Sequence, residues 1–289
     1  MVTATPGQKG AAMTSTPCEV YAGIDWLSMT TGDSPDADAA YARARALAVE
    51  QTDAGDRLRP WSSHGYKGFG TPHLRCGVRD ADVLVELSGP LADRYWQEFV
   101  PLAKHVTRVD TQVTCTYSHE VRDLALQAYH APAVVVRPGL PPIRKALFQE
   151  ANGGQTLYLG APSSTRRARL YDKSAESGGE YPPNTWRYEV QERSPLGGVT
   201  VDALRSADDV PRSIAALVHA LYRTHGIEPW FNADRRAVYR ASRPGRRDLS
   251  RWLEWLQHAV RPGVCRWSDR ETRTAILRAL GLDDAEPGQ

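Results

Sequence analysis

Alternation of polar and apolar residues with a period of two, repeated in several segments, most limits what this chain can fold into. Residues 106–117 show it at the greatest length. One side of that segment carries Arg108, Asp110, Gln112, Thr114 and Thr116, and the other carries Val109, Thr111, Val113, Cys115 and Tyr117. Side chains alternate between the two faces of a strand, so each such segment predicts a strand with one polar face and one apolar face. The apolar faces must pack on helices, whereas the polar faces stay open to solvent or to a ligand.

The order of the predicted elements indicates an α+β fold. Strands are expected at 21–30, 74–79, 83–88, 106–117, 155–160, 166–173 and 185–193, and helices at 36–53, 90–104, 118–129, 211–224, 248–260 and 268–280. Gly65, Gly68 and Gly70 indicate a loop. This order predicts an antiparallel or mixed sheet with helices on one face, followed by a helical C-terminal region.

Length and composition suggest three regions within the 289 residues. Residues 1–18 are expected to be a disordered leader without the apolar core of a secretory signal. Residues 19–200 are expected to form an α+β domain, and residues 201–289 a helical, arginine-rich region. No apolar run approaches the roughly 20 residues that a membrane span needs. The expected location is therefore the cytoplasm, with no membrane partner.

The distribution of charge is more informative than its sum. The net charge is only +2, but the segment from Arg235 to Arg273 contains eleven arginines and four acidic residues. Arginine suits bidentate contact with phosphate. The candidate phosphate contacts in this segment are Arg243, Arg246, Arg247 and Arg251. The alternative is a solvated, arginine-rich helix surface.

Two arginine–acid pairs stand out on the predicted polar face. Asp110 follows Arg108 by two residues, and Glu189 follows Arg187 by two residues, so each acid shares a face with its arginine. Carboxylates gathered on one face repel unless a cation lies between them, and their hard oxygens suit Mg²⁺ or Mn²⁺. The alternative is a ladder of arginine–carboxylate pairs across the strands, which would neutralise the same charges.

Several common catalytic motifs are absent. None of the eight histidines forms an HxH pair, and the chain has no GxxxxGK[ST] phosphate loop, no HExxH and no GxSxG. ATP-driven helicase activity is therefore not encoded in this sequence.

Five segments, in this order along the chain, resemble the Rep-trans family of replication initiation factors. They are Gly23–Ser28 (GIDWLS), Val85–Gly89 (VELSG), Arg108–Asp110 (RVD), Thr156–Lys173 (TLYLGAPSSTRRARLYDK) and Arg187–Glu189 (RYE). The family includes rolling-circle plasmid initiators, filamentous-phage initiators and relaxases of integrated mobile elements. The similar stretch spans about residues 21–193, and its TLYLG…YDK run is the most specific part.

The resemblance implies a fold and a reaction, with residues 19–200 as the catalytic and DNA-binding α+β domain. The fold would be two sheet-and-helix halves sharing one central, largely antiparallel sheet. The reaction would be a metal-dependent single-strand nick at a DNA origin, made by a tyrosine that keeps a 5′-phosphotyrosyl link. The implied metal ligands are Asp110 and Glu189. The implied phosphate-contacting or supporting residues are Arg108, Tyr158, Arg169, Tyr171, Lys173 and Arg187. A host helicase and a second copy of the chain are candidate partners, and the sequence decides neither.

The nucleophile departs from the pattern of the family. Plasmid-type members carry the tyrosine on the helix after the R-x-E strand, but residues 193–210 contain no tyrosine. Tyr181, in a Gly/Pro-rich loop, is the candidate replacement. Tyr188 falls on the apolar face of its strand, and Tyr222 has apolar neighbours on a helix, so both are expected in the core. The alternatives are an origin-binding protein of this fold that has lost cleavage and, less favoured, an RNA nuclease using the same acidic face.

Overall fold

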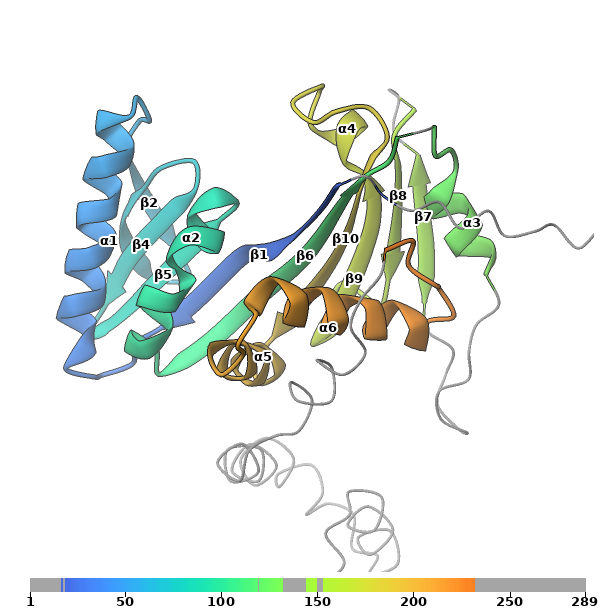
Figure 1. The fold of residues 1–289 in the computed structure, drawn as a ribbon. Helices are drawn as coiled ribbons and strands as arrows, with labels where there is room; N and C mark the ends of the chain where they lie inside the picture. The colour runs from blue at the N-terminus through green and yellow to red at the C-terminus, as the bar shows by residue number, and fades with distance from the viewer. Residues whose placement is uncertain (1–16, 18, 119, 132–143, 150–152, 232–289) are drawn as a thin grey trace, which may run out of the picture. The chain divides into compact units, whose positions relative to one another are not determined.

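The computed structural model describes residues 17, 19–118, 120–131, 144–149 and 153–231 (Figure 1). Its strands are β1 (Glu19–Thr30), β2 (Arg59–Ser63), β3 (Tyr66–Gly70), β4 (Leu74–Arg79), β5 (Asp82–Ser88), β6 (His105–Thr116), β7 (Lys145–Gln149), β8 (Gln155–Leu159), β9 (Arg166–Asp172) and β10 (Thr185–Arg193). Its helices are α1 (Asp36–Asp53), α2 (Pro90–Phe99), the 3₁₀ turn η1 (Val100–Leu102), α3 (Leu124–His130), α4 (Lys173–Glu176), α5 (Leu196–Arg205) and α6 (Val210–Thr224). The fold class is α+β, as the sequence predicted.

All the strands pair antiparallel in one sheet, in the order β2-β3-β4-β5-β1-β6-β10-β9-β8-β7. Read outward from the centre, β1-β5-β4-β3-β2 has the same plan as β6-β10-β9-β8-β7. β1 and β6 pair along most of their lengths and join the two halves. The expected fold of two sheet-and-helix halves that share a central antiparallel sheet is therefore confirmed.

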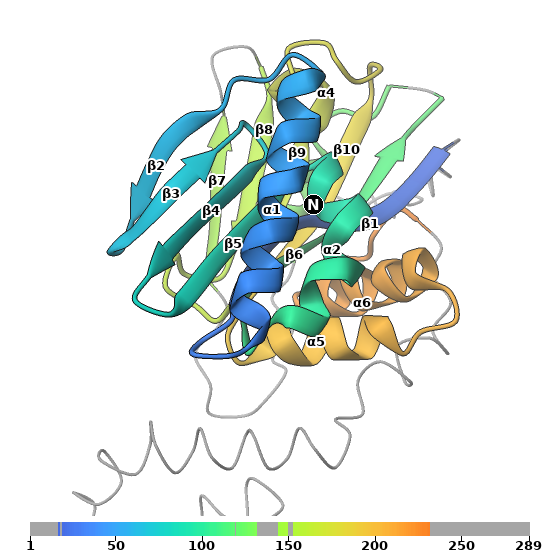
Figure 2. The same ribbon diagram turned by 90° about the vertical axis from the view of Figure 1, so that its left-hand side faces the viewer.

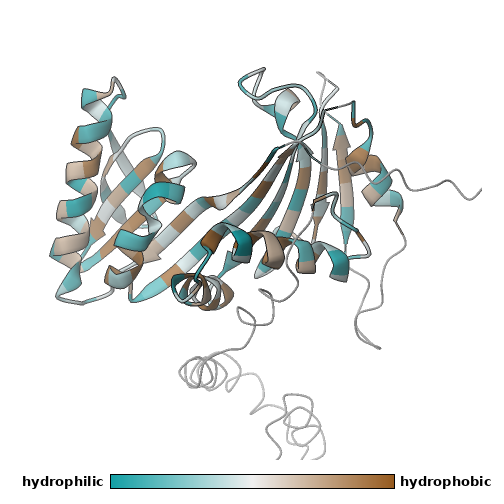
Figure 3. Cartoon of the chain, viewed as in Figure 1, coloured by the Kyte–Doolittle hydropathy of each residue, from teal (hydrophilic) through white to brown (hydrophobic). Residues whose placement is uncertain are grey.

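Helices pack against the apolar face of both halves (Figure 2). α1 and α2 contact the strands of the first half, α3 contacts the outer strands of the second, and α5 and α6 contact the central strands. Alternate strand residues such as Leu27, Val85, Val109 and Val113 are buried in this core, and brown and teal residues alternate along the strands in Figure 3. The helices thus cover one face and leave the polar face of the central strands free for a site.

Tyr188 and Tyr222 are core residues, as predicted. Both side chains are fully buried, and their rings meet edge to face with centroids 5.2 Å apart. The Tyr222 hydroxyl donates to the backbone oxygen of Arg169 at 2.6 Å and to that of Glu189 at 3.2 Å. Helix α6 therefore fixes the backbone of β9 and β10 at the point where these strands carry their polar residues.

The glycine-rich stretch around Gly68 is a hairpin rather than a loop. Gly68 lies in β3 opposite Gly77 of β4. A Cβ atom on Gly68 would lie 2.8 Å from the Gly77 Cα and closer still to the Cys76 carbonyl oxygen. The glycines therefore permit close approach of two strands, which is a second use of glycine that the sequence pattern does not distinguish from a turn.

One other predicted boundary was wrong. The helix expected from Ser118 begins at Leu124, and Asp123 before it has a left-handed backbone with φ of 56°. The domain boundary expected at residue 200 falls inside α5, which contacts β6 and β10. Because α5 and α6 bury their apolar sides on the sheet, both helices belong to the α+β body. The helices expected at 248–260 and 268–280 and the leader up to residue 16 lie outside the described residues.

Two further features of the fold concern its cysteines and the length of its helices. Cys76 and Cys115 are buried free thiols, and burial raises the pKa of each to about 12. Cys18 and Cys265 lie outside the described residues. Among the helices that the structure describes, none combines the length and apolar character needed to cross a bilayer.

Candidate functional site

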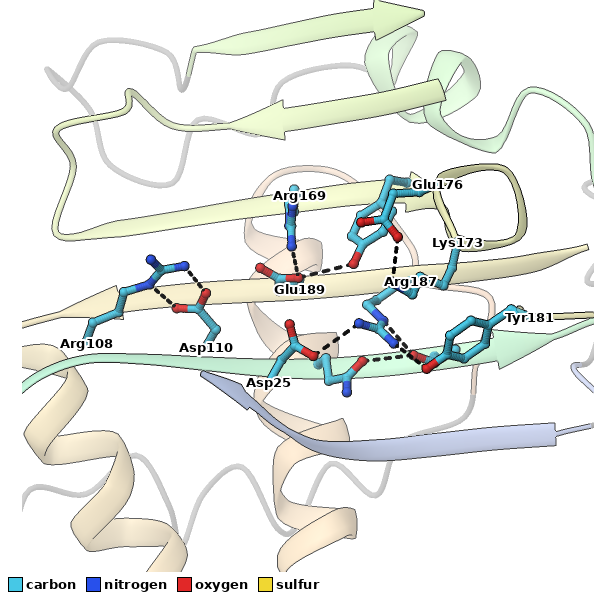
Figure 4. Close-up of polar contacts among 12 residues, drawn as sticks. Asp25, Arg108, Asp110, Arg169, Lys173, Glu176, Tyr181, Arg187 and Glu189 are labelled. Atoms are coloured by element: carbon cyan, nitrogen blue, oxygen red, sulfur yellow. Dashed lines mark hydrogen bonds and ion pairs between the residues drawn. The ribbon is translucent and has the colours of Figure 1, made fainter. Parts of the chain in front are cut away.

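The polar face of the central strands brings together most of the residues predicted for the site. Strand register places Arg187 opposite Thr114, and Glu189 lies between Gln112 of β6 and Arg169 of β9. These residues therefore share one face, because side chains directly opposite each other in a sheet point the same way. Figure 4 shows the side chains of Arg169, Arg187 and Glu189 with those of Asp25 and Tyr181 on adjoining segments.

Three arginine–carboxylate pairs dominate this face (Figure 4). Arg108 binds Asp110 through two nitrogens, with Nε 2.8 Å from Oδ1. Arg169 Nη2 lies 2.7 Å from Glu189 Oε2, and Arg187 Nη1 lies 3.2 Å from Asp25 Oδ1. The Arg187 Nε also donates to the Thr114 hydroxyl at 2.9 Å. Arginines therefore neutralise Asp110 and Glu189. This arrangement is the ladder of arginine–carboxylate pairs given above as the alternative to a metal site.

Asp110 and Glu189 lie on one face, but they do not form an open pair of metal ligands. Their exposed fractions are 1% and 3%. Burial raises the pKa of Glu189 to about 7, the Arg169 charge opposes that rise, and the Asp110 charge adds to it. Burial likewise raises the pKa of Asp110, while Arg108 opposes the rise. The expected convergence is therefore present, and the expected solvent access of both acids is not.

The case for a divalent cation at this face rests on the type of ligand atoms present and not on a complete metal-binding site. Asp110 and Glu189 supply hard oxygens, and each carboxylate is destabilised by burial and by like charge nearby. Within the part of the chain that the structure describes, no three His, Cys, Asp or Glu side chains lie close enough to hold one ion. A cation at this place would compete with Arg108 and Arg169 for the two carboxylates. Metal binding stays a prediction.

Tyr181 reaches the same face from the loop between α4 and β10. Its hydroxyl accepts a hydrogen bond from Arg187 Nη2 at 3.1 Å. The Lys173 ammonium lies 5.2 Å from the centre of its ring and is also paired with Glu176 at 2.6 Å. Two cationic side chains therefore surround a partly exposed phenol at one end of the arginine–carboxylate row.

A pocket of about 140 Å³ opens beside the row, on the side of β9 and β8. It is lined by Arg108, Tyr158, Arg167, Ala168, Arg169, Glu189 and Gln191. The Nε atoms of Arg167 and Arg169 are buried and have no hydrogen-bond partner among the described residues. Unpaired buried donors carry an energetic cost, which is a common feature of functional sites.

Tyr171 is placed differently from its prediction as a DNA-contacting residue. Its side chain is only 2% exposed, and its hydroxyl donates to Glu189 Oε2 at 3.4 Å. Direct contact with DNA is therefore not expected of it, and Tyr171 supports Glu189 instead. Burial raises the pKa of this phenol well above its ordinary value.

Tyr158, in contrast, lines the pocket, with the Arg167 guanidinium 4.1 Å from its ring centre. Arg243, Arg246, Arg247 and Arg251 lie outside the described residues.

Three residues of this polar face were not among the site residues predicted from the sequence. Asp25 pairs with Arg187, Arg167 lines the pocket, and Phe148 is 55% exposed with its ring 5.5 Å from that of Tyr158. A signal for Asp25 was present, because the GIDWLS segment contains the acid. The face on which Asp25 lies could not be predicted, because a bulge in β1 between Ile24 and Trp26 interrupts the alternation of side chains between the two faces of the strand.

An arginine–glutamate pair recurs at the equivalent place in the first half. Arg75 of β4 is in register with Glu86 of β5, as Arg169 of β9 is with Glu189 of β10. The Arg75–Glu86 distance is 3.4 Å. The two halves therefore share a local contact as well as a strand order, and the first-half pair is the more exposed of the two.

Comparison with known proteins supports the architecture. No family model and no curated protein matches the sequence. A solved structure described as a rolling circle replication initiator protein from Geobacillus stearothermophilus matches 72% of this chain and 86% of that chain, with 22% identity and a TM-score of 0.50. This chain is similar in fold to that initiator. The resemblance to Rep-trans initiators is thus supported at the level of the fold.

Proposed function

We propose that this chain is a replication initiator that nicks one DNA strand at an origin, with the polar face as its DNA-binding surface. The observation that carries the proposal is the Tyr181 hydroxyl, 3.1 Å from Arg187 Nη2, at the end of a row of arginines. The similarity in fold to a rolling-circle replication initiator supports it. Origin DNA is the proposed partner, and a host helicase and a second copy of the chain remain predictions.

The pocket and its aromatic border suit single-stranded DNA. Arg108, Arg167 and Arg169 line the pocket, and guanidinium groups suit contact with phosphate oxygens. Tyr158 and the exposed Phe148 lie beyond Arg167 and offer ring faces or edges to unpaired bases. Cationic grooves bordered by aromatic rings are the usual way to hold a single strand without reading its sequence.

The reaction assigns a role to each group near Tyr181. The phenolic oxygen attacks phosphorus, the phenolic proton passes to solvent, and the bond from phosphorus to the 3′ oxygen breaks. That oxygen takes a proton from water, which leaves a 3′ hydroxyl end and a 5′-phosphotyrosyl link. Arg187 orients the phenol by donating a hydrogen bond to its oxygen, and the Lys173 ammonium lies 5.2 Å from the centre of its ring, where both cations face the incoming phosphate charge.

A divalent cation, Mg²⁺ or Mn²⁺, fits this reaction by donor type. Asp110 and Glu189 would hold it, and it would supply Lewis-acid neutralisation of the phosphate when bound. Glu189 borders the pocket that we assign to the phosphate.

The test is formation of a covalent adduct. The full chain is incubated with Mn²⁺ and a pool of randomised single-stranded DNA labelled at the 3′ end, and adducts are separated under denaturing conditions. We expect a labelled adduct, and we expect Tyr181→Phe to lose the phosphotyrosyl peptide that contains residue 181. Tyr129→Phe is the matched control, since Tyr129 is 39% exposed on α3.

The second candidate function is origin binding without cleavage. Two observations favour it: Asp110 and Glu189 are both held in arginine pairs, and α5 contains no tyrosine. DNA binding by the unchanged chain without any adduct would support this function and would overturn the nicking proposal.

A further inference from the structure

Tyr21 is a second phenol on the face that carries Tyr181. In strand register Tyr21 lies opposite Thr114, which in turn lies opposite Arg187 on β10. Because Arg187 Nε reaches the Thr114 hydroxyl, all three side chains are on the polar face. Tyr21 is 48% exposed, so a DNA strand laid on this face has access to it.

Asp93 of α2 holds the Tyr21 hydroxyl. Strand β5 ends its pairing with β1 at Trp26 and Ser88, and α2 lies against the edge of β1 that β5 leaves free. Asp93 Oδ1 accepts the Ile24 N–H at 3.0 Å, and Asp93 Oδ2 accepts the Tyr21 hydroxyl in a short hydrogen bond. One carboxylate oxygen is thus anchored on the backbone while the other faces the phenol.

Gly23 makes the Tyr21–Asp93 contact possible. A Cβ atom at residue 23 would lie 2.7 Å from the Tyr21 hydroxyl oxygen and closer still to Asp93 Oδ1. Both atoms are the ends of side chains, so an added methyl group would push the pair apart without moving the backbone. The strand therefore has a glycine where any other residue would separate the phenol from the carboxylate.

The surroundings of Tyr21 are those of a phenol that needs a base in order to react. Burial raises its pKa first, and the hydrogen bond to Asp93 raises the pKa further, whereas the charge of Arg187 lowers it. A phenol that keeps its proton at neutral pH is a weak nucleophile unless a positioned acceptor removes the proton during attack. The anchored Asp93 carboxylate is such an acceptor.

We propose that Tyr21 is a second nucleophilic tyrosine of this site, with Asp93 as its proton acceptor. The inference rests on the proposed nicking function. The Tyr21 oxygen attacks phosphorus, its proton moves to Asp93, the bond from phosphorus to the 3′ oxygen breaks, and that oxygen takes a proton from water. A chain with two such phenols can hold one 5′ end on Tyr181 while Tyr21 cleaves a second copy of the origin. The freed 3′ hydroxyl then displaces Tyr181 from the first phosphate and closes the strand.

The experiment maps the adduct tyrosine in single variants of the full chain. The probe is the 3′-labelled, randomised single-stranded DNA with Mn²⁺, and adduct peptides are identified by mass spectrometry. In Tyr181→Phe we expect a remaining adduct on residue 21. Asp93→Asn should reduce that adduct about a hundredfold or more, the range expected for loss of a positioned base.

Gly23→Ala separates the proposed role from mere loss of folding. It keeps both side chains but displaces them, so it should lower the Tyr21 adduct as Asp93→Asn does, with an unchanged midpoint of thermal unfolding. Tyr129→Phe should leave both adducts unchanged. An adduct on Tyr181 alone, with none on Tyr21 in any variant, would overturn the inference and leave the nicking proposal standing. Absence of every adduct from the unchanged chain would overturn both.

Discussion

Glu189 is subject to two opposing influences. Its side chain is almost fully buried, which favours the neutral acid, while Arg169 at 2.7 Å favours the carboxylate. Burial prevails, and the pKa rises to about 7. A buried carboxyl near neutrality on a face open to a ligand is typical of functional sites, because such sites hold charge at a cost to stability. The same residue therefore yields one prediction about cleavage and another about stability.

Glu189→Gln should abolish adduct formation with Mn²⁺ and leave affinity for single-stranded DNA largely intact. The amide keeps the size of the side chain and removes the charge that a divalent cation would need. Binding is measured by fluorescence anisotropy and cleavage by the adduct assay. Retained cleavage in this variant would remove Glu189 from the proposed metal ligands.

Glu189→Gln should also change the pH dependence of stability. The folded state holds the Glu189 proton more tightly than the unfolded chain, whose pKa is near 4.5. This carboxyl therefore contributes stability that is full below pH 4.5 and is lost as the pH rises through about 7. The free energy of unfolding of the variant minus that of the wild type should rise by roughly 3 kcal/mol across that window. Urea titrations at several pH values give this difference, and a flat difference would contradict the assigned pKa.

At the scale of elements, glycine acts differently in the hairpin β3–β4 and in helix α5. Gly68 lies where two strand backbones approach too closely for any side chain. Gly198 lies in α5, and a Cβ atom there would meet nothing within 4 Å. The first glycine is required by packing, and the second only adds conformational freedom to the unfolded chain.

Gly68→Ala and Gly198→Ala should therefore change stability in opposite directions. The first should lower the free energy of unfolding by about 1–3 kcal/mol, because the backbone of β4 must shift. The second should raise it by up to about 1 kcal/mol, the difference between glycine and alanine in a helix. Urea unfolding measures both. If both substitutions changed the free energy of unfolding by the same amount, the expected steric clash between residue 68 and the backbone of β4 would be contradicted.

At the scale of the whole molecule, the sheet joins two halves, and their polar faces meet at β1 and β6. Asp25 comes from the first half, and Asp110, Arg187 and Glu189 come from the second. The Arg187–Asp25 pair spans the junction. The site thus depends on the central strand pair, and neither half contains all of it. The net charge of the chain is only +2, so the proposed binding of DNA would depend on local groups of arginines.

Salt dependence should separate the arginine groups. Each phosphate contact on a single strand contributes about 0.7 to the slope of log affinity against log salt. Arg167→Ala should reduce that slope by about 0.7, and replacement of Arg243, Arg246, Arg247 and Arg251 together by alanine should reduce it by up to about 3. Anisotropy titrations at several salt concentrations test both. An unchanged slope in the fourfold variant would remove these arginines from the DNA-binding surface.

The sequence alone determined the α+β class, most strands and the polar identity of one sheet face, because period-two alternation is a local property of each strand. It also determined that Tyr188 and Tyr222 belong to the core. Only the tertiary structure decided the partners of Asp110 and Glu189, the burial of Tyr171 and the contribution of Asp25, because these depend on strand register and on a bulge in β1. The Tyr21–Asp93 contact is of the same kind: it joins residues 72 positions apart, across a gap that only a glycine leaves open.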